Sequence, residues 1–196
     1  MSVRNHASFV RAGIAGLVIA TVLGCSREKP ADTVTPTLEE FTKRVEEYVT
    51  LHKRLADSVG PLDETKSQAE IAARATILAN AIVAARPGAK QGDIFTIETA
   101  TIIATLIKEE YRRRPSPVIE TRGDTQEELP DFVPKVNELY PTSYPLATFP
   151  PTLLPLLPKL PEEVEYRIVN HYLMLRDIES NLIIDFMPNA VPAEKS

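Results

Sequence analysis

The sequence predicts an α+β fold, made of an antiparallel three-helix unit, a proline-rich wrapping segment and a small C-terminal antiparallel three-stranded β-meander. Three observations predict it. Apolar residues recur at helical spacing over residues 37–114, eleven of the 17 prolines lie in residues 115–161, and apolar and charged residues alternate from Val164 onward. The expected divisions are a leader (1–24), a tether (25–36), the three-helix unit (37–114), a proline-rich connector (115–161), the meander (162–188) and a flexible tail (189–196).

Residues 1–24 are expected to be an export signal, because Arg4 and Arg11 precede an apolar core of twelve residues that ends at Leu23. Twelve apolar residues are too few to span a bilayer, which takes about twenty. The run Val22-Leu23-Gly24-Cys25 resembles the bacterial lipobox. This resemblance implies cleavage between Gly24 and Cys25 and a lipid anchor on the Cys25 sulfur.

The residue after the cysteine, Ser26, resembles the pattern of lipoproteins that two-membrane bacteria pass to the outer membrane. We therefore expect an exported protein, lipid-anchored to a bacterial membrane on its periplasmic face, with the outer membrane favoured if the cell has one. The stretch 26–36 is polar and holds two prolines, which predicts a solvated tether. Without Arg4 and Arg11 the mature chain has 20 basic and 27 acidic residues, a net charge of −7, which argues against a nucleic-acid partner.

The first expected helix has the strongest periodicity of the chain, with apolar or aromatic positions alternately three and four residues apart. These positions are Leu38, Phe41, Val45, Tyr48, His52, Leu55 and Val59. Thr37 and Glu40 form a capping box at its start, and Gly60-Pro61 ends it.

A second helix is expected over about residues 63–86, followed by Pro87-Gly88. Its predicted buried face is Ile71, Ala75, Leu78 and Ile82. A third is expected from near Asp93 to Arg114, apolar around much of its circumference and hence covered on more than one side. The short connections 60–62 and 87–92 predict antiparallel neighbours.

Prolines Pro155, Pro158 and Pro161 recur every third residue, with leucines between them. This proline-leucine arm, residues 153–161, is either a polyproline II docking surface or an extended segment packed on its own domain; the cost of exposing so many leucines favours packing. After it, residues 164–169, 172–176 and 182–187 are the expected strands, with Asn170-His171 as the first turn. The meander is expected to pack on the third helix.

The meander weakly resembles the C-terminal meander of the periplasmic nickel and cobalt homeostasis family and of unannotated exported bacterial proteins. The resemblance covers about thirty of the 196 residues and rests on Leu160-Pro161, Tyr166, Val169, Leu173, Leu175, Asp177, Ile184 and Asp185. Asn170 stands in place of the usual turn glycine, His171 in place of the acidic residue after it, and no His-rich tract accompanies the meander. The resemblance implies an exported β-meander.

Candidate site residues are few. His52 is interpreted as a buried or edge histidine of the first helix, and His171 as a solvated turn residue. The positive charges of Lys108 and Arg112–Arg114 are expected to stabilise the C-terminus of the third helix through the helix dipole, or could bind an anion. The acidic residues of the first helix lie off its apolar face, as expected for a solvated surface: Glu39, Glu40, Glu46 and Glu47.

The sequence has no GxSxG, HExxH or phosphate-binding glycine loop, so we expect no catalytic residue, no cofactor and no metal site. Two functions remain open. The favoured one is a non-catalytic, lipid-anchored envelope protein that binds an unknown envelope protein or itself. The alternative is a periplasmic small-molecule or metal-binding lipoprotein, with His52, His171 or Asp185 as possible ligands.

Overall fold

The computed structural model describes Met1 and residues 30–60, 67–113, 132–142 and 149–191. Its elements are α1 (Pro30–Val59), α2 (Gln68–Ala85), α3 (Ile97–Arg113), the 3-10 helix η2 (Leu154–Leu156), β1 (Val164–Val169), β2 (Tyr172–Asp177) and β3 (Ile183–Met187). The predicted α+β class and C-terminal antiparallel sheet are confirmed. Apart from Met1, the predicted signal peptide lies outside the described residues, as does Cys25.

The sheet is a meander with strand order β1-β2-β3. Its first hairpin pairs Val169 with Tyr172 across the two-residue loop Asn170-His171, as predicted. Asn170 has φ 53°, in the left-handed region that asparagine tolerates better than most residues, which explains how it replaces a glycine in this turn. The predicted strand limits are correct to within one residue.

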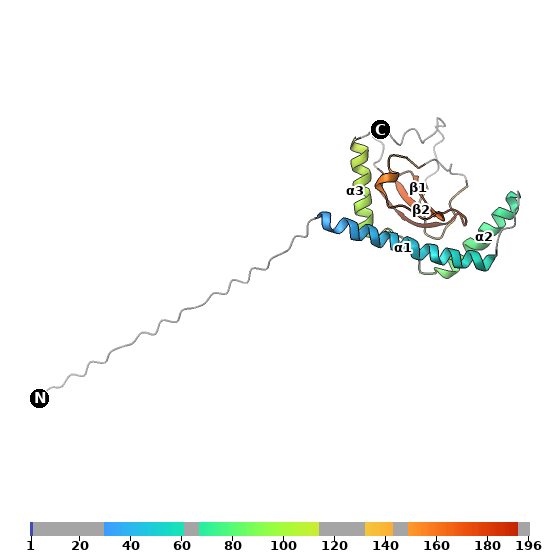
Figure 1. Ribbon diagram of the computed structural model, residues 1–196, viewed down its shortest axis with the longest axis horizontal. Coiled ribbons are helices and arrows are strands. Elements are labelled where there is room, and N and C mark those ends of the chain that lie inside the picture. The colour runs from blue at the N-terminus through green and yellow to red at the C-terminus, as the bar shows by residue number, and fades with distance from the viewer. Residues whose placement is uncertain (2–29, 61–66, 114–131, 143–148, 192–196) are drawn as a thin grey trace.

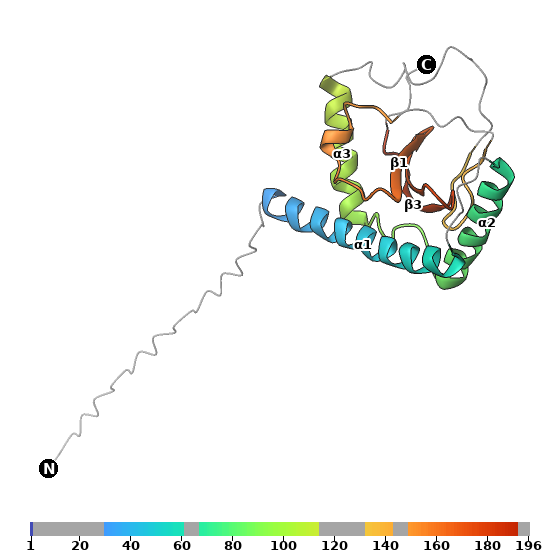
Figure 2. The same ribbon diagram turned by 45° about the vertical axis from the view of Figure 1, so that its right-hand side comes forward.

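The helices frame the sheet instead of forming a separate bundle. Figures 1 and 2 show α1 along one side of the sheet, with α3 rising near one end of α1 and α2 at the other. α1 contacts both other helices. The three predicted helices are present, and each contributes to a core that is shared with the sheet.

The main core lies between the three helices and one face of the sheet. Its fully buried members include Phe41 and Val45 of α1, Leu78 and Ile82 of α2, Ile103 and Ile107 of α3, and Leu173, Leu175 and Ile184 of the sheet. A smaller cluster covers the opposite face, where Tyr140 packs on Val169, Met174, Ile183 and Phe186. The predicted apolar face of α1 is therefore the face that meets the sheet.

The proline-leucine arm packs on its own domain. Leu153 is fully buried and Leu157 is nearly so, and both belong to the main core. Leu154, by contrast, is 51% exposed. The arm therefore lies on the surface of the core, anchored by Leu153 and Leu157 and exposing Leu154 to solvent.

Three helix starts differ from the expectations. α1 begins at Pro30, so the predicted tether is helical over residues 30–36 and Thr37 is not its N-cap. Pro36 lies inside α1 at an exposed position, where only one backbone bond is lost and water can reach the carbonyl left free. α2 begins after Ser67, whose side chain accepts from the Glu70 N–H, and α3 begins at Ile97 after the Thr96 cap.

Candidate functional site

The most concentrated polar chemistry joins α1 to the turn after β2. The Asp177 carboxylate, fully buried, accepts a hydrogen bond from the Tyr48 hydroxyl at 2.6 Å and contacts Nδ1 of His52 at 2.6 Å. The Ser180 N–H donates to its other oxygen at 2.8 Å. His52 is only 3% exposed, so this cluster of Tyr48, His52 and Asp177 is closed to solvent.

The second nitrogen of the same imidazole faces another carboxylate. Nε2 of His52 lies 3.3 Å from Glu179, and Glu179 also forms an ion pair with Arg74 of α2. His52 thus stands between the carboxylates of Asp177 and Glu179. The contacts connect α1, α2 and the β2–β3 turn, so their evident role is to hold the helices on the sheet.

The electrostatics of this cluster favour an ionised Asp177. Burial raises the pKa of Asp177, but the hydrogen bonds from His52, Tyr48 and the Ser180 N–H outweigh burial and leave the pKa below its ordinary value. Burial, followed by the charge of Asp177, raises the pKa of Tyr48, which therefore stays a hydrogen-bond donor. The Arg86 guanidinium lies 5.0 Å from the Tyr48 ring centroid, adding a cation–π contact.

A second buried carboxylate, Asp185 of β3, fixes the segment that precedes α3. One oxygen accepts from the N–H groups of Gly92 and Phe186, and the other from those of Ile94 and Phe95, at 2.7–2.9 Å. Burial raises the pKa of Asp185, and the four backbone donors oppose that shift. All these partners are backbone groups, so Asp185 is an anchor for the 92–95 segment.

The structure does not bring together the three side chains that were considered as ligands. His52 contacts Asp177 and Glu179, Asp185 binds the 92–95 backbone, and His171 lies in the first hairpin loop with its ring 4.2 Å from that of Tyr172. Across the described ranges, no group of three His, Cys, Asp or Glu residues is arranged to hold a metal ion.

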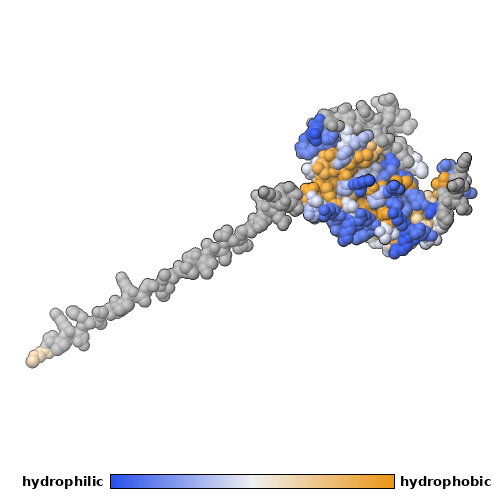
Figure 3. Space-filling model, viewed as in Figure 1, coloured by the Kyte–Doolittle hydropathy of each residue, from blue (hydrophilic) through white to orange (hydrophobic). Residues whose placement is uncertain are grey.

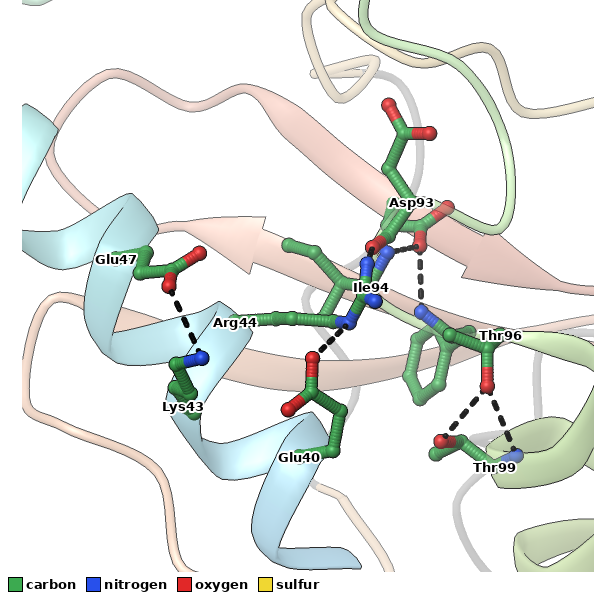
Figure 4. A network of polar contacts seen from close by, with 10 residues as sticks. Glu40, Lys43, Arg44, Glu47, Asp93, Ile94, Thr96 and Thr99 are labelled. Atoms are coloured by element: carbon green, nitrogen blue, oxygen red, sulfur yellow. Dashed lines mark hydrogen bonds and ion pairs between the residues drawn. The ribbon is translucent and has the colours of Figure 1, made fainter. Parts of the chain in front are cut away.

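The charged helix surfaces are placed as the sequence indicates. Glu39, Glu40, Glu46 and Glu47 are all exposed. Figure 4 shows Arg44 bound to Glu40 on α1 and reaching the Asp93 carbonyl at 2.8 Å, which ties α1 to the segment before α3. At the end of α3, Arg112 pairs with Glu109 and Arg113 with Glu110, while Arg114 lies outside the described residues.

Two grooves flank the proline-leucine arm. The α1 groove, about 500 Å³, lies between α1 and the arm and is lined by Leu38, Glu39, Thr42, Lys43, Glu46 and residues 155–158, together with Thr35. The β1 groove, about 750 Å³, lies between the arm and β1 and is lined by Phe149, Leu154, Pro155, residues 157–160 and residues 164–167. Figure 3 shows an apolar area over α3 and the segment beside it, above a largely hydrophilic α1.

Sequence reasoning missed both the Asp177 cluster and the grooves. The sequence indicates a turn over residues 177–181 and includes Asp177 in the meander resemblance, but neither pattern shows that α1 supplies partners for this carboxylate. The α1 groove arises because the arm packs against α1, more than a hundred residues away in the sequence, whereas the β1 groove lies between the arm and the strand that follows it.

No protein-family model, curated protein or solved structure matches this chain. Among the described residues, no helix is both long and apolar enough to cross a membrane.

Proposed function

We propose that this protein is a non-catalytic, lipid-anchored bacterial envelope protein that acts as a protein-interaction module through the surface around its proline-leucine arm. The lipobox-like run ending at Cys25 supports the anchor. The observation that carries the interaction role is the pair of grooves on either side of the arm, which place Leu154 and Pro155 at an open, partly apolar surface.

The buried polar groups support the non-catalytic part of the proposal. Both nitrogens of His52 face carboxylates, and the Asp185 oxygens accept four backbone N–H bonds. Neither residue is among those that line the two grooves. A general acid or base must reach a substrate, and these groups are occupied inside the fold.

A site-specific photo-crosslinking experiment in cells tests the proposal. A photoreactive amino acid replaces Leu154, which lines the β1 groove, or Ile97, a matched control that is 83% exposed and belongs to neither groove. We expect one discrete crosslinked envelope protein from position 154 and none from position 97. The same diffuse pattern from both positions would contradict the proposal.

The same preparations address the alternative of a small-molecule or metal-binding lipoprotein. The purified protein is analysed by native mass spectrometry for retained ligands. A stoichiometric small molecule or metal, with no protein crosslinked at position 154, would replace the interaction role by that alternative.

A further inference from the structure

The two outer edges of the sheet, formed by β1 and β3, differ in the hydrogen bonding of their outward backbone groups. In a two-residue hairpin the residues next to the loop form a hydrogen-bonded pair, so Val169, Arg167 and Glu165 direct their backbone groups toward β2. The alternate residues Ile168, Tyr166 and Val164 then direct theirs outward. The bond from the Val164 N–H to the Pro161 carbonyl, outside the sheet, agrees with this assignment.

At the β3 edge, most of the outward backbone groups that the register identifies are occupied. The N–H and C=O of Ile183 bond to Glu138 and Asn137, the Ile184 carbonyl accepts from Arg86, and the Phe186 N–H bonds to Asp185. At the β1 edge, the backbone groups of Tyr166 and Ile168 have no partner among the residues that the structure describes. An open row of this kind is a template for another strand.

The β1 groove lies along this open edge. It is lined by four successive residues of β1, Val164, Glu165, Tyr166 and Arg167. Successive side chains of a strand point to opposite faces of the sheet, so a groove that touches all four runs beside the strand edge and not over one face. Since β2 occupies the other edge, the groove lies where a further strand would lie.

We propose that the free edge of β1 binds an extended peptide segment of a partner protein as a fourth strand of the sheet. This inference rests on the proposed interaction function and names the partner class. The Tyr166 and Ile168 backbone groups would supply the hydrogen bonds, which fit any extended peptide backbone, and the groove would supply the preference for side chains.

The groove lining defines that preference. Phe149, Leu157 and Leu160 give it an apolar side, next to the Tyr166 ring, which packs on Phe149 with centroids 5.8 Å apart. Lys159 also lines the groove, is exposed, and forms no ion pair with another residue in the described part of the chain. The expected peptide has an apolar side chain facing Phe149 and Leu160 and an acidic side chain near Lys159.

The first test uses the purified mature chain and a phage-displayed library of random ten-residue peptides. Selected peptides are synthesised with a single N-methyl group at each position in turn, and their affinities are compared. Because only every second residue of an added strand bonds to β1, we expect losses of about tenfold or more at alternate positions and small effects between them. Amide hydrogen exchange should slow at Tyr166 and Ile168 when the peptide is bound.

A protein variant provides the matching control. Ile168→Pro removes an N–H that faces the open edge, so it leaves the β1–β2 ladder intact and should weaken peptide binding about tenfold or more. Ile168→Val keeps the N–H and should bind as the wild type does. If Ile168→Pro does not fold, the N-methyl scan still decides the question.

Failure of strand addition is distinguishable from failure of the proposed function. A library that yields no binder, a scan without two-residue periodicity, or a peptide that binds without protecting Tyr166 and Ile168 would overturn the inference. So would a dimer of the chain that protects these amides without peptide, because the edge would then belong to a second copy. A discrete crosslink from position 154 in cells would nevertheless retain the interaction function.

Discussion

At the scale of single residues, Asp177 is the point on which donors from α1 and the β2–β3 turn converge. Replacing it with alanine leaves the Tyr48 hydroxyl, the His52 ring and the Ser180 N–H without their buried acceptor. Removing one partner of such a buried set costs about 3–5 kcal/mol. We expect Asp177→Ala to lower the free energy of unfolding by that amount, measured by urea denaturation.

The matched control is Glu179→Gln. Glu179 contacts the other nitrogen of His52, but its side chain is partly exposed. Because water reaches the Glu179 carboxylate, which is 41% exposed, this variant should lose less unfolding free energy than Asp177→Ala. Equal losses of unfolding free energy in Asp177→Ala and Glu179→Gln would contradict the conclusion that Asp177 is the main acceptor of this cluster.

The lowered pKa of Asp177 also predicts a pH dependence. Because its folded pKa lies below the ordinary value of 3.8, Asp177 contributes stability above that pH and loses it as the pH falls through the folded pKa. We expect the wild type to lose its advantage over Asp177→Asn as the pH falls below about 4. Urea titrations of both proteins from pH 6 to pH 2.5 measure the difference between their free energies of unfolding. Asp185, whose pKa is shifted in the opposite direction, is present in both proteins, so its contribution cancels in this difference. A constant difference across that range would contradict the ionised state of Asp177.

At the scale of elements, the arm is held by two of its leucines and exposes a third. Truncating a fully buried leucine costs about 2–5 kcal/mol, because transfer and cavity terms add. We therefore expect Leu153→Ala to destabilise the protein by that amount and Leu154→Ala to leave stability almost unchanged, measured by urea denaturation. A small effect of Leu153→Ala would mean that the arm is not part of the core.

The strands were predictable at this scale and the helix packing was not. Alternation in β1 and the prolines around the meander depend only on neighbouring residues, so the sequence shows them directly. The placement of α3 depends on Asp185, which binds residues 92–95 from about ninety positions away. Similarly, the spacing of α1 indicated that His52 is a buried or edge residue, but its partner Asp177 is 125 positions away, and periodicity cannot identify a partner so distant in the sequence.

At the scale of the whole molecule, the proposed lipid anchor on Cys25 can be tested in cells that produce the full chain. If Cys25 carries the lipid, Cys25→Ser should abolish processing and leave a precursor larger than the mature protein by the 24-residue leader. Immunoblotting of membrane fractions and labelling with a palmitate analogue measure this outcome. Processing and labelling identical to those of the wild type would remove the lipoprotein assignment.

The early start of α1 determines how far the folded domain can travel. With Pro30 already helical, four residues separate Cys25 from α1, and even a fully extended chain of that length spans only about 15 Å. The proposed anchor would therefore confine the domain to a thin layer beside the bilayer and limit its search for partners to two dimensions. Partners attached to the same membrane would meet it at a high effective concentration, so a weak affinity at the β1 edge would suffice there and would be ineffective toward freely diffusing proteins.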